Sequence, residues 1–374
     1  MKLYVVDFTS HSNVDRLSKL LDITLSKSLE SKNNIEVVRI SSAEEFYKAT
    51  SSGSLKGCPL FFAVSLDKGG FNRNAYETLS FLNSSLERQY LSGCFGAVAV
   101  DGQGEMFTKD IGRRLVFAAN LSGCAFPGKP LVEATGSLAN FKVLAKLQNT
   151  TLEKTYEKSL TMLIEKLLSF AGFLSSSGDT SMSEKPKILA IHAGNKTTSN
   201  SYLLWKMVSE DLGSHAEIEE ISIRNGELTD CRGCKYEDCL HFGEKGRCFY
   251  GGVMTDKVYP AIINCDILML ICPNYNDSVT ANIMAFINRL TSVFRAHDFS
   301  RKKIFSIIVS GYSGGDIVAQ QIIGAINMNK NFVLPSSFAM IETANKPKEI
   351  LNITDIKEKA AKFAANILQS QYNI

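Results

Sequence analysis

The chain has 374 residues, of which 45% are hydrophobic and 21% are charged, which is typical of a soluble globular protein with two domains. Its net charge is only +3, without a basic block, so the composition speaks against a partner made of nucleic acid. No apolar run reaches the roughly 18 residues that cross a bilayer, and we expect no membrane span.

The use of cysteine predicts the compartment. The chain has nine cysteines, and its first residues lack the flanks and length of a signal peptide. Clustered thiols in a reducing compartment more often hold a metal or do redox chemistry than form structural disulfides. We therefore expect a cytoplasmic protein.

The first half of the chain alternates apolar segments with amphipathic ones. The apolar segments predict strands, and the segments between them predict helices. This alternation is typical of a parallel sheet with helices on both faces. The predicted strands are residues 2–7, 35–40, 60–65 and 94–100, and the last predicted helix is 151–170.

A polar segment of small residues, 174–186, predicts a linker. After it the same order of elements starts again, so the two halves predict an α/β protein with two tandem, five-stranded, doubly wound parallel sheets. Such sheets bind ligands at the carboxyl ends of their strands. The predicted elements of the second half are strands at 188–192, 217–223, 266–272, 303–309 and 332–340 and helices at 199–212, 255–263, 279–294 and 355–369.

Three loops of the second half follow predicted strands at this edge. The first loop, residues 193–201, leads into a predicted helix and contains several hydroxyls and one lysine. This combination suits a phosphate monoester. The second places a tyrosine against a flat ring, and the third is rich in glycine, so its backbone can approach a ligand. Each loop alone also fits an ordinary cap or turn. The candidate cofactor residues are Gly194, Lys196, Thr197, Ser199, Asn200, Ser201, Pro273, Asn274, Tyr275, Asn276, Ser310, Gly311, Tyr312, Gly314 and Gly315.

These motifs resemble those of the flavodoxin-like NAD(P)H-dependent FMN reductases, including their iron–sulfur flavoprotein branch. The Gly-Ser-x-Arg…Gly-Asn-Thr of that family corresponds to residues 193–196 and 199–201. Its Pro-x-Tyr corresponds to 273–275, and its Lys-x-Phe-x-Asp-Arg to 284–289. The resemblance covers the chain from about residue 186 to the end. The departures from the family pattern are Ala193, Lys196, Met284 and Asn288.

The resemblance implies two flavodoxin-like folds and an FMN site in the second half. It implies a ping-pong oxidoreductase that takes electrons from NAD(P)H, or from a reduced ferredoxin, and passes them to a small organic acceptor such as a quinone or a flavin. The cofactor supplies this chemistry, so we assign no catalytic side chain. The resemblance also implies a homo-oligomer, because flavin sites in the family commonly lie at subunit interfaces.

Four cysteines, Cys231, Cys234, Cys239 and Cys248, precede the third predicted strand of the second half. Groups of four thiolates bind iron–sulfur clusters or zinc. In the iron–sulfur flavoproteins that the chain resembles, a cysteine run at this place holds a [4Fe–4S] cluster near the flavin. A zinc site and unliganded cysteines, redox-active in a subset, remain the alternatives.

The corresponding loops of the first half contain Asp67, Asp101 and Glu105 and have no tyrosine at a strand end. Carboxylates at this edge repel an anionic cofactor. We therefore expect residues 1–173 to form a flavodoxin-like domain without cofactor and residues 187–374 to form the FMN-binding reductase domain. Two other functions remain open, a non-enzymatic electron-transfer flavoprotein between protein partners and a zinc-stabilised binding module.

Overall fold

The computed structural model describes residues 1–10, 15–30, 35–84, 88–176, 185–224 and 228–371. The chain divides into two compact units, Met1–Ser176 (unit 1) and Ser177–Ile374 (unit 2), and each is described by itself. Among the described residues, none of the helices has the length and apolar character that a membrane crossing requires.

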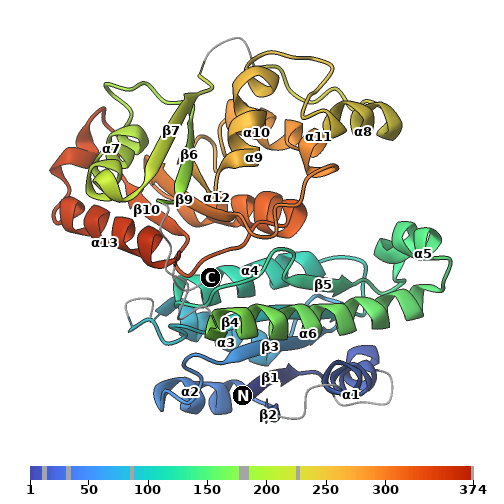
Figure 1. The fold of residues 1–374 in the computed structure, drawn as a ribbon. Coiled ribbons are helices and arrows are strands. Elements are labelled where there is room, and N and C mark those ends of the chain that lie inside the picture. Colours follow the sequence, from blue (N-terminus) through green and yellow to red (C-terminus); the bar gives the residue numbers. More distant parts are fainter. Residues whose placement is uncertain (11–14, 31–34, 85–87, 177–184, 225–227, 372–374) are drawn as a thin grey trace. The chain divides into compact units, whose positions relative to one another are not determined.

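Unit 1 is a parallel sheet of five strands in the order β2-β1-β3-β4-β5 (Figure 1). The central strands have almost continuous apolar runs because helices cover both faces of the sheet. The strands are β1 (Lys2–Phe8), β2 (Glu36–Ile40), β3 (Pro59–Leu66), β4 (Phe95–Gly102) and β5 (Leu131–Ala134). The helices are α1 (Arg16–Leu29), α2 (Ala43–Ser51), α3 (Arg73–Ser84), α4 (Thr108–Leu121), η2 (Ala139–Phe141), α5 (Lys142–Gln148) and α6 (Leu152–Ser176).

Helix α6 is longer than the sequence suggests. It continues to Ser176, so the first three residues of the expected linker are helical, and residues 177–184 of that linker lie outside the described residues. The buried side chains of α6 pack on α1 and on the sheet; they are Tyr156, Leu160, Leu163, Ile164, Leu167 and Leu168.

Unit 2 repeats this topology, with the strand order β10-β9-β8-β6-β7. Counted along the chain, both sheets have the order 2-1-3-4-5 of flavodoxin-like folds, so the predicted fold class is confirmed. The strands are β6 (Lys187–His192), β7 (Glu217–Ser222), β8 (Ile267–Pro273), β9 (Lys303–Ser310) and β10 (Ala339–Thr343). The helices are α7 (Asn200–Leu212), η4 (Gly213–His215), α8 (Tyr236–Glu244), η5 (Met254–Val258), α9 (Tyr259–Asn264), α10 (Ala281–Arg289), α11 (Thr291–Phe294), α12 (Gly315–Ile322), η6 (Ile323–Met328), η7 (Glu349–Asn352) and α13 (Ile356–Gln369).

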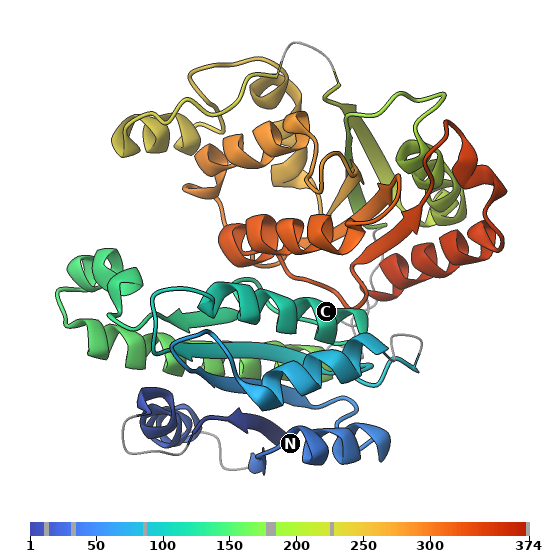
Figure 2. The ribbon, with the colours of Figure 1, turned by 180° about the vertical axis from the view of Figure 1, so that it is seen from behind.

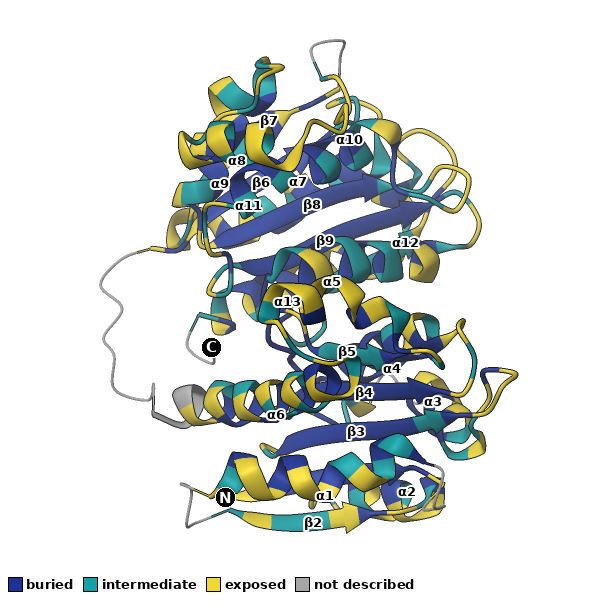
Figure 3. Ribbon diagram, turned by 90° about the vertical axis from the view of Figure 1, so that its right-hand side faces the viewer, coloured by how far each residue is buried: buried dark blue, intermediate teal, exposed yellow. Residues whose placement is uncertain are grey.

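The sheet of unit 2 lies between two helical layers. Helices α7 and α13 pack together on one face, and α9, α10 and α12 cover the other (Figures 1 and 2). Strands β8 and β9 are buried along nearly their whole length (Figure 3). Ligands therefore reach the sheet at the ends of its strands.

The fifth strand of unit 2 begins later than the expected range of 332–340 and overlaps it only at Ala339 and Met340. Val333 forms only an isolated bridge with Lys303, and the chain then turns at Ser337, whose φ is +49°. The paired strand β10 begins at Ala339. The apolar run Phe332–Leu334 was misleading because it is a buried connection, whereas β10 is an edge strand with half-buried residues.

Candidate active site

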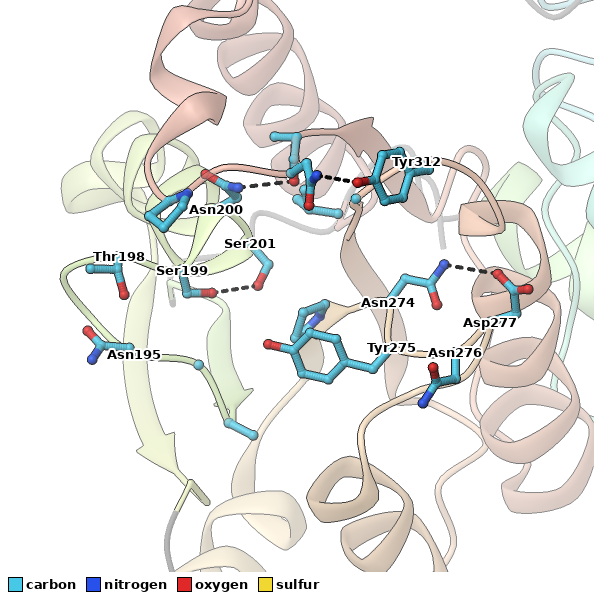
Figure 4. A pocket seen from close by; sticks show the side chains of 18 of the residues that line it. Asn195, Thr198, Ser199, Asn200, Ser201, Asn274, Tyr275, Asn276, Asp277 and Tyr312 are labelled. Atoms are coloured by element: carbon cyan, nitrogen blue, oxygen red, sulfur yellow. Dashed lines mark hydrogen bonds between the residues drawn. The ribbon is translucent and has the colours of Figure 1, made fainter.

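A cavity of about 820 Å³ lies at the carboxyl edge of the unit 2 sheet (Figure 4). All three expected loops contribute to its lining. The candidate residues that line it are Gly194, Ser199, Asn200, Ser201, Pro273, Asn274, Tyr275, Asn276, Gly311 and Tyr312. The candidates Lys196, Thr197, Ser310, Gly314 and Gly315 are not among the lining residues.

The first loop places the start of α7 at the cavity. Ser199 caps this helix, and its hydroxyl accepts a bond from the Tyr202 amide at 3.5 Å. A Cβ at Gly194 would lie 2.6 Å from the Ser199 Oγ, so only glycine lets the loop pass so close to the cap. The positive end of the helix dipole and the unpaired amides of its first turn suit an anionic ligand.

Asn200 connects the first loop to the loop that follows β10. Its amide nitrogen donates to the carbonyls of Ala344 and Lys346, at 3.0 and 2.9 Å, and its carbonyl oxygen accepts from the Ile350 amide at 3.2 Å. The side chain lines the cavity, but its polar atoms are already bonded within the protein. Its primary role is therefore to hold two walls of the cavity together.

Lys196 bonds to Glu220 of β7, away from the cavity lining. The Glu220 carboxylate also accepts bonds from the Tyr202 hydroxyl at 3.0 Å and from the Trp205 indole at 3.2 Å. Burial acts to raise the pKa of Glu220, but these three donors outweigh it and lower the pKa below the usual value. The cation that the sequence suggests for a phosphate is thus paired with a carboxylate of the chain, although the lysine side chain is exposed.

His192 lies beneath this group and is fully buried. Burial lowers the pKa of its imidazole and Lys196 lowers it further, while the charge of Glu220 acts in the opposite direction. The ring centroid lies 4.7 Å from that of Tyr202, and the Nε2 atom lies 3.6 Å from Oε1 of Glu220, so the histidine packs against the side chains that surround Lys196.

The second loop is a tight turn that exposes an aromatic ring. Tyr275 and Ser278 exchange two backbone hydrogen bonds, both of 3.2 Å, and Asn276 and Asp277 have φ values of +54° and +53°. Positive φ at both central residues is the geometry of a type I′ turn, which Asn and Asp adopt more readily than most residues. The Tyr275 side chain is 65% exposed at the cavity.

Asn274 connects the second loop to the third. Its amide nitrogen donates to the Ser310 hydroxyl at 3.1 Å and to the Ser313 carbonyl at 2.8 Å. Gly314 has a φ of +83°, and a Cβ there would collide with the Asp277 carboxylate. Gly314 therefore permits the close approach of the two loops. Figure 4 shows Asn274 beside Asp277, to which it also donates within the second loop.

Sequence reasoning missed part of the lining. Several of the missed residues come from the loop after β10, whose strand was misplaced. Arg224 follows β7 and is the cation among the described lining residues. No motif marks it. The missed residues are Ala193, Asn195, Thr198, Arg224, Asp277, Val309, Ser313, Ala344, Asn345 and Pro347.

The four clustered cysteines lie apart from the cavity lining. Burial raises the pKa of Cys239, Arg295 lowers it, and the other three thiols raise it further, so the four thiols are electrostatic neighbours. In the described parts of the chain, however, no group of three or more His, Cys, Asp or Glu side chains could hold a metal ion. As arranged here, the cysteines do not fit the expected metal site.

The cysteine segment is attached to α10 and α11 by side-chain bonds. Asn288 donates to Asp230 at 3.0 Å, the buried Arg289 donates to the Gly251 carbonyl at 2.8 Å, and the Ser292 hydroxyl donates to the Arg247 carbonyl at 2.6 Å. These bonds give Asn288 and Arg289 a structural role. The two residues belong to the motif on the helix that follows the second loop. Both residues position the cysteine segment.

Residues 186–346 match the family model of the NADPH-dependent FMN reductases. No curated protein matches the chain. The match covers the three loops, the cysteine segment and all five strands of unit 2, and it ends just after β10.

Solved structures with a similar fold include three that align with half of this chain or slightly less. RosB, with a bound 8-demethyl-8-formylriboflavin-5'-phosphate intermediate, is 16% identical over 50% of this chain and 77% of its own, with a TM-score of 0.39. The FMN-dependent NADH-azoreductase from Bacillus anthracis is 13% identical over 50% and 100%, with a TM-score of 0.34. The Trp repressor binding protein from Bacillus subtilis is 18% identical over 47% and 95%, with a TM-score of 0.32.

Proposed function

We propose that this chain, whose residues 186–346 match the family model of the NADPH-dependent FMN reductases, binds FMN in the unit 2 cavity and reduces a small organic acceptor with NAD(P)H. The observation that carries the proposal is the meeting of three loops around one cavity at the edge where doubly wound sheets bind ligands. The cavity volume is within the range of small-molecule sites.

Each wall of the cavity suits a different part of FMN. The start of α7, with the hydroxyls of Ser199 and Ser201, suits the phosphate. Tyr275 and the third loop suit the ring system, because an aromatic face can stack on it and the backbone around Gly311 can approach its polar edge. Bound FMN would supply the hydride chemistry, and the chain would bind the cofactor, orient it and limit the access of water.

The acceptor would share the open side of the cavity with the nicotinamide. Tyr312 is 82% exposed there, and its hydroxyl accepts a bond from Asn345 at 2.8 Å. An exposed aromatic side chain can cover a flat acceptor such as a quinone or a free flavin. We propose ping-pong turnover at this site, in a cytoplasmic homo-oligomer.

Flavin content and turnover test the proposal. The purified protein, after incubation with FMN and gel filtration, should retain FMN and oxidise NADPH or NADH when a quinone is present. Failure to retain FMN would overturn the proposed cofactor. Retention of FMN without turnover by either nucleotide would favour the second candidate, an electron-transfer flavoprotein that serves protein partners such as a ferredoxin.

The iron–sulfur part of the hypothesis lacks the geometric support that the cavity gives to FMN. No step of the proposed reaction depends on an iron–sulfur cluster. Iron, sulfide and zinc assays on anaerobically purified protein test it directly. About four irons per chain would establish the [4Fe–4S] cluster, and about one zinc would favour a structural metal site.

A further inference from the structure

The charges around the cavity are few. Among the described residues that line it, Asp277 is the carboxylate and Arg224 the guanidinium. Asp277 follows β8, next to the third loop, whereas Arg224 follows β7, on the other side of β6. Two strand spacings of about 4.8 Å each separate β7 from β8, so the two charges belong to different sides of the cavity.

The strand register places Arg224 beside the first loop. His192 of β6 pairs with Ser222 of β7, and the Ile223 amide donates to the His192 carbonyl at 2.8 Å. Because parallel strands advance together, the position two residues beyond Ser222 is level with Gly194. Arg224 is therefore a near neighbour of the loop that leads into the start of α7.

The backbone of Arg224 is fixed, and its charge is available. Asn282 of α10 donates to the carbonyl of Arg224 at 2.8 Å. The side chain is exposed, and within the described parts of the chain no hydrogen bond or ion pair engages its guanidinium. Lys196, by contrast, has its charge taken up by Glu220.

From this arrangement we infer that Arg224 is the cation that pairs with the phosphate of bound FMN, in place of Lys196. The inference rests on the proposed function and adds the residue that selects FMN over riboflavin. A guanidinium can form two parallel hydrogen bonds with a phosphate, which an ammonium cannot. Asp277, two strands away, disfavours the opposite orientation of the cofactor by charge repulsion.

The test compares FMN with riboflavin on the full-length protein freed of flavin. The binding of each flavin is followed by the quenching of its fluorescence, for the wild type, Arg224→Gln, Arg224→Lys and the matched control Lys196→Gln. Arg224→Gln should weaken FMN binding by about ten- to a hundredfold and leave riboflavin binding unchanged. Arg224→Lys should recover part of the loss, and Lys196→Gln should keep the preference for FMN.

Three results would overturn the inference. In the first, Arg224→Gln binds FMN as the wild type does, while Lys196→Gln loses the preference. In the second, both flavins weaken equally in Arg224→Gln, which assigns the arginine to the ring or to the fold. In the third, flavin binding is unchanged but the KM for NADPH rises and that for NADH does not, which assigns it to the nicotinamide nucleotide. A wild-type protein that binds neither flavin would contradict the proposed function itself, and the inference with it.

Discussion

At the residue scale, Gly314 controls how closely the second and third loops can approach. Its φ is +83°, and a Cβ would collide with Asp277 and lie 2.9 Å from the Asn274 amide nitrogen. We expect Gly314→Ala to lower the unfolding free energy of unit 2 by about 1–3 kcal/mol and to weaken FMN binding. The control is Gly233→Ala, because Gly233 also has a positive φ, +66°, but has open space around it. Equal FMN affinity in the two variants would show that the loop contact is unimportant for binding.

The Glu220 carboxylate makes the unfolding free energy of unit 2 depend on pH. Its folded-state pKa is lowered, so its bonds stabilise the fold above the unfolded value of 4.5 and are lost as the pH falls through the lower folded value. Glu220→Gln should therefore lower the unfolding free energy by about 1–3 kcal/mol near neutral pH, and the difference from the wild type should shrink in acid. Trp205, the single tryptophan of the chain, is buried against Glu220 and reports unfolding by fluorescence. Glu219→Gln is the control, and a constant difference down to about pH 3 would contradict this account.

The residues of the site differ in how well the sequence predicts them. Residues in a motif, such as Ser199 and Tyr275, could be predicted because a helix cap and a strand end have local signatures. The direction of the Lys196 side chain, toward the cavity or toward Glu220, depends on the neighbouring strand β7, which is distant in sequence. Arg224 depends on register in the same way, since pairing between β6 and β7 sets its level. Local patterns do not contain this information.

At the scale of elements, buried parallel strands gave the clearest pattern. Strands β8 and β9 lie in the middle of the sheet, and their apolar runs match their observed bounds closely. Strand β10 is at the edge and half-buried, so its sequence is less distinctive than the apolar connection before it. The segment expected as one helix over 279–294 is divided at Leu290 into α10 and α11. Its apolar period continues across the break, which hides it from the sequence.

The start of α1 in unit 1 differs from the start of α7 in a way that bears on ligand binding. The carboxylate of Asp15, the cap of α1, accepts bonds from the Ser18 amide and the Ser65 hydroxyl, both at 2.9 Å, and from the Ser10 amide at 2.8 Å. Burial acts to raise the pKa of Asp15, and these donors lower it below its usual value. An internal anion therefore already uses the donors at this helix start.

Replacement of that cap should loosen the first turn of α1. We expect Asp15→Ala to destabilise the helix by about 1–2 kcal/mol, because the Ser18 amide loses its acceptor. Hydrogen exchange across residues 16–29 should become faster. Asp22→Ala is the control on the same helix, since Asp22 is exposed and pairs only at the surface with Arg39. Equal exchange in the two variants would contradict the role of the cap.

At the scale of the whole molecule, two units share one topology but differ at the edge where a ligand would bind. In unit 1, Arg16 donates to Asp101 at 2.6 Å and to the carbonyls of Thr135 and Gly136 at 3.0 and 2.8 Å. Its guanidinium thus links the ends of β4 and β5 from within. From the sequence, only the acidic residues in the loops of unit 1 predict this difference between the two edges. The contact between the Arg16 guanidinium and the Asp101 carboxylate cannot be predicted from the sequence.

These differences predict the flavin stoichiometry of the intact chain. A cofactor phosphate at α1 would compete with the carboxylate of Asp15, and a ring above β4 would meet the bonded pair of Arg16 and Asp101. In unit 2 the equivalent helix start is capped by the neutral Ser199 and faces a cavity. Titration of the flavin-free protein with FMN should therefore saturate at about one FMN per chain. A second equivalent that binds with similar affinity, and that survives disruption of the unit 2 site by Gly314→Ala, would show that unit 1 binds flavin despite its internal charges.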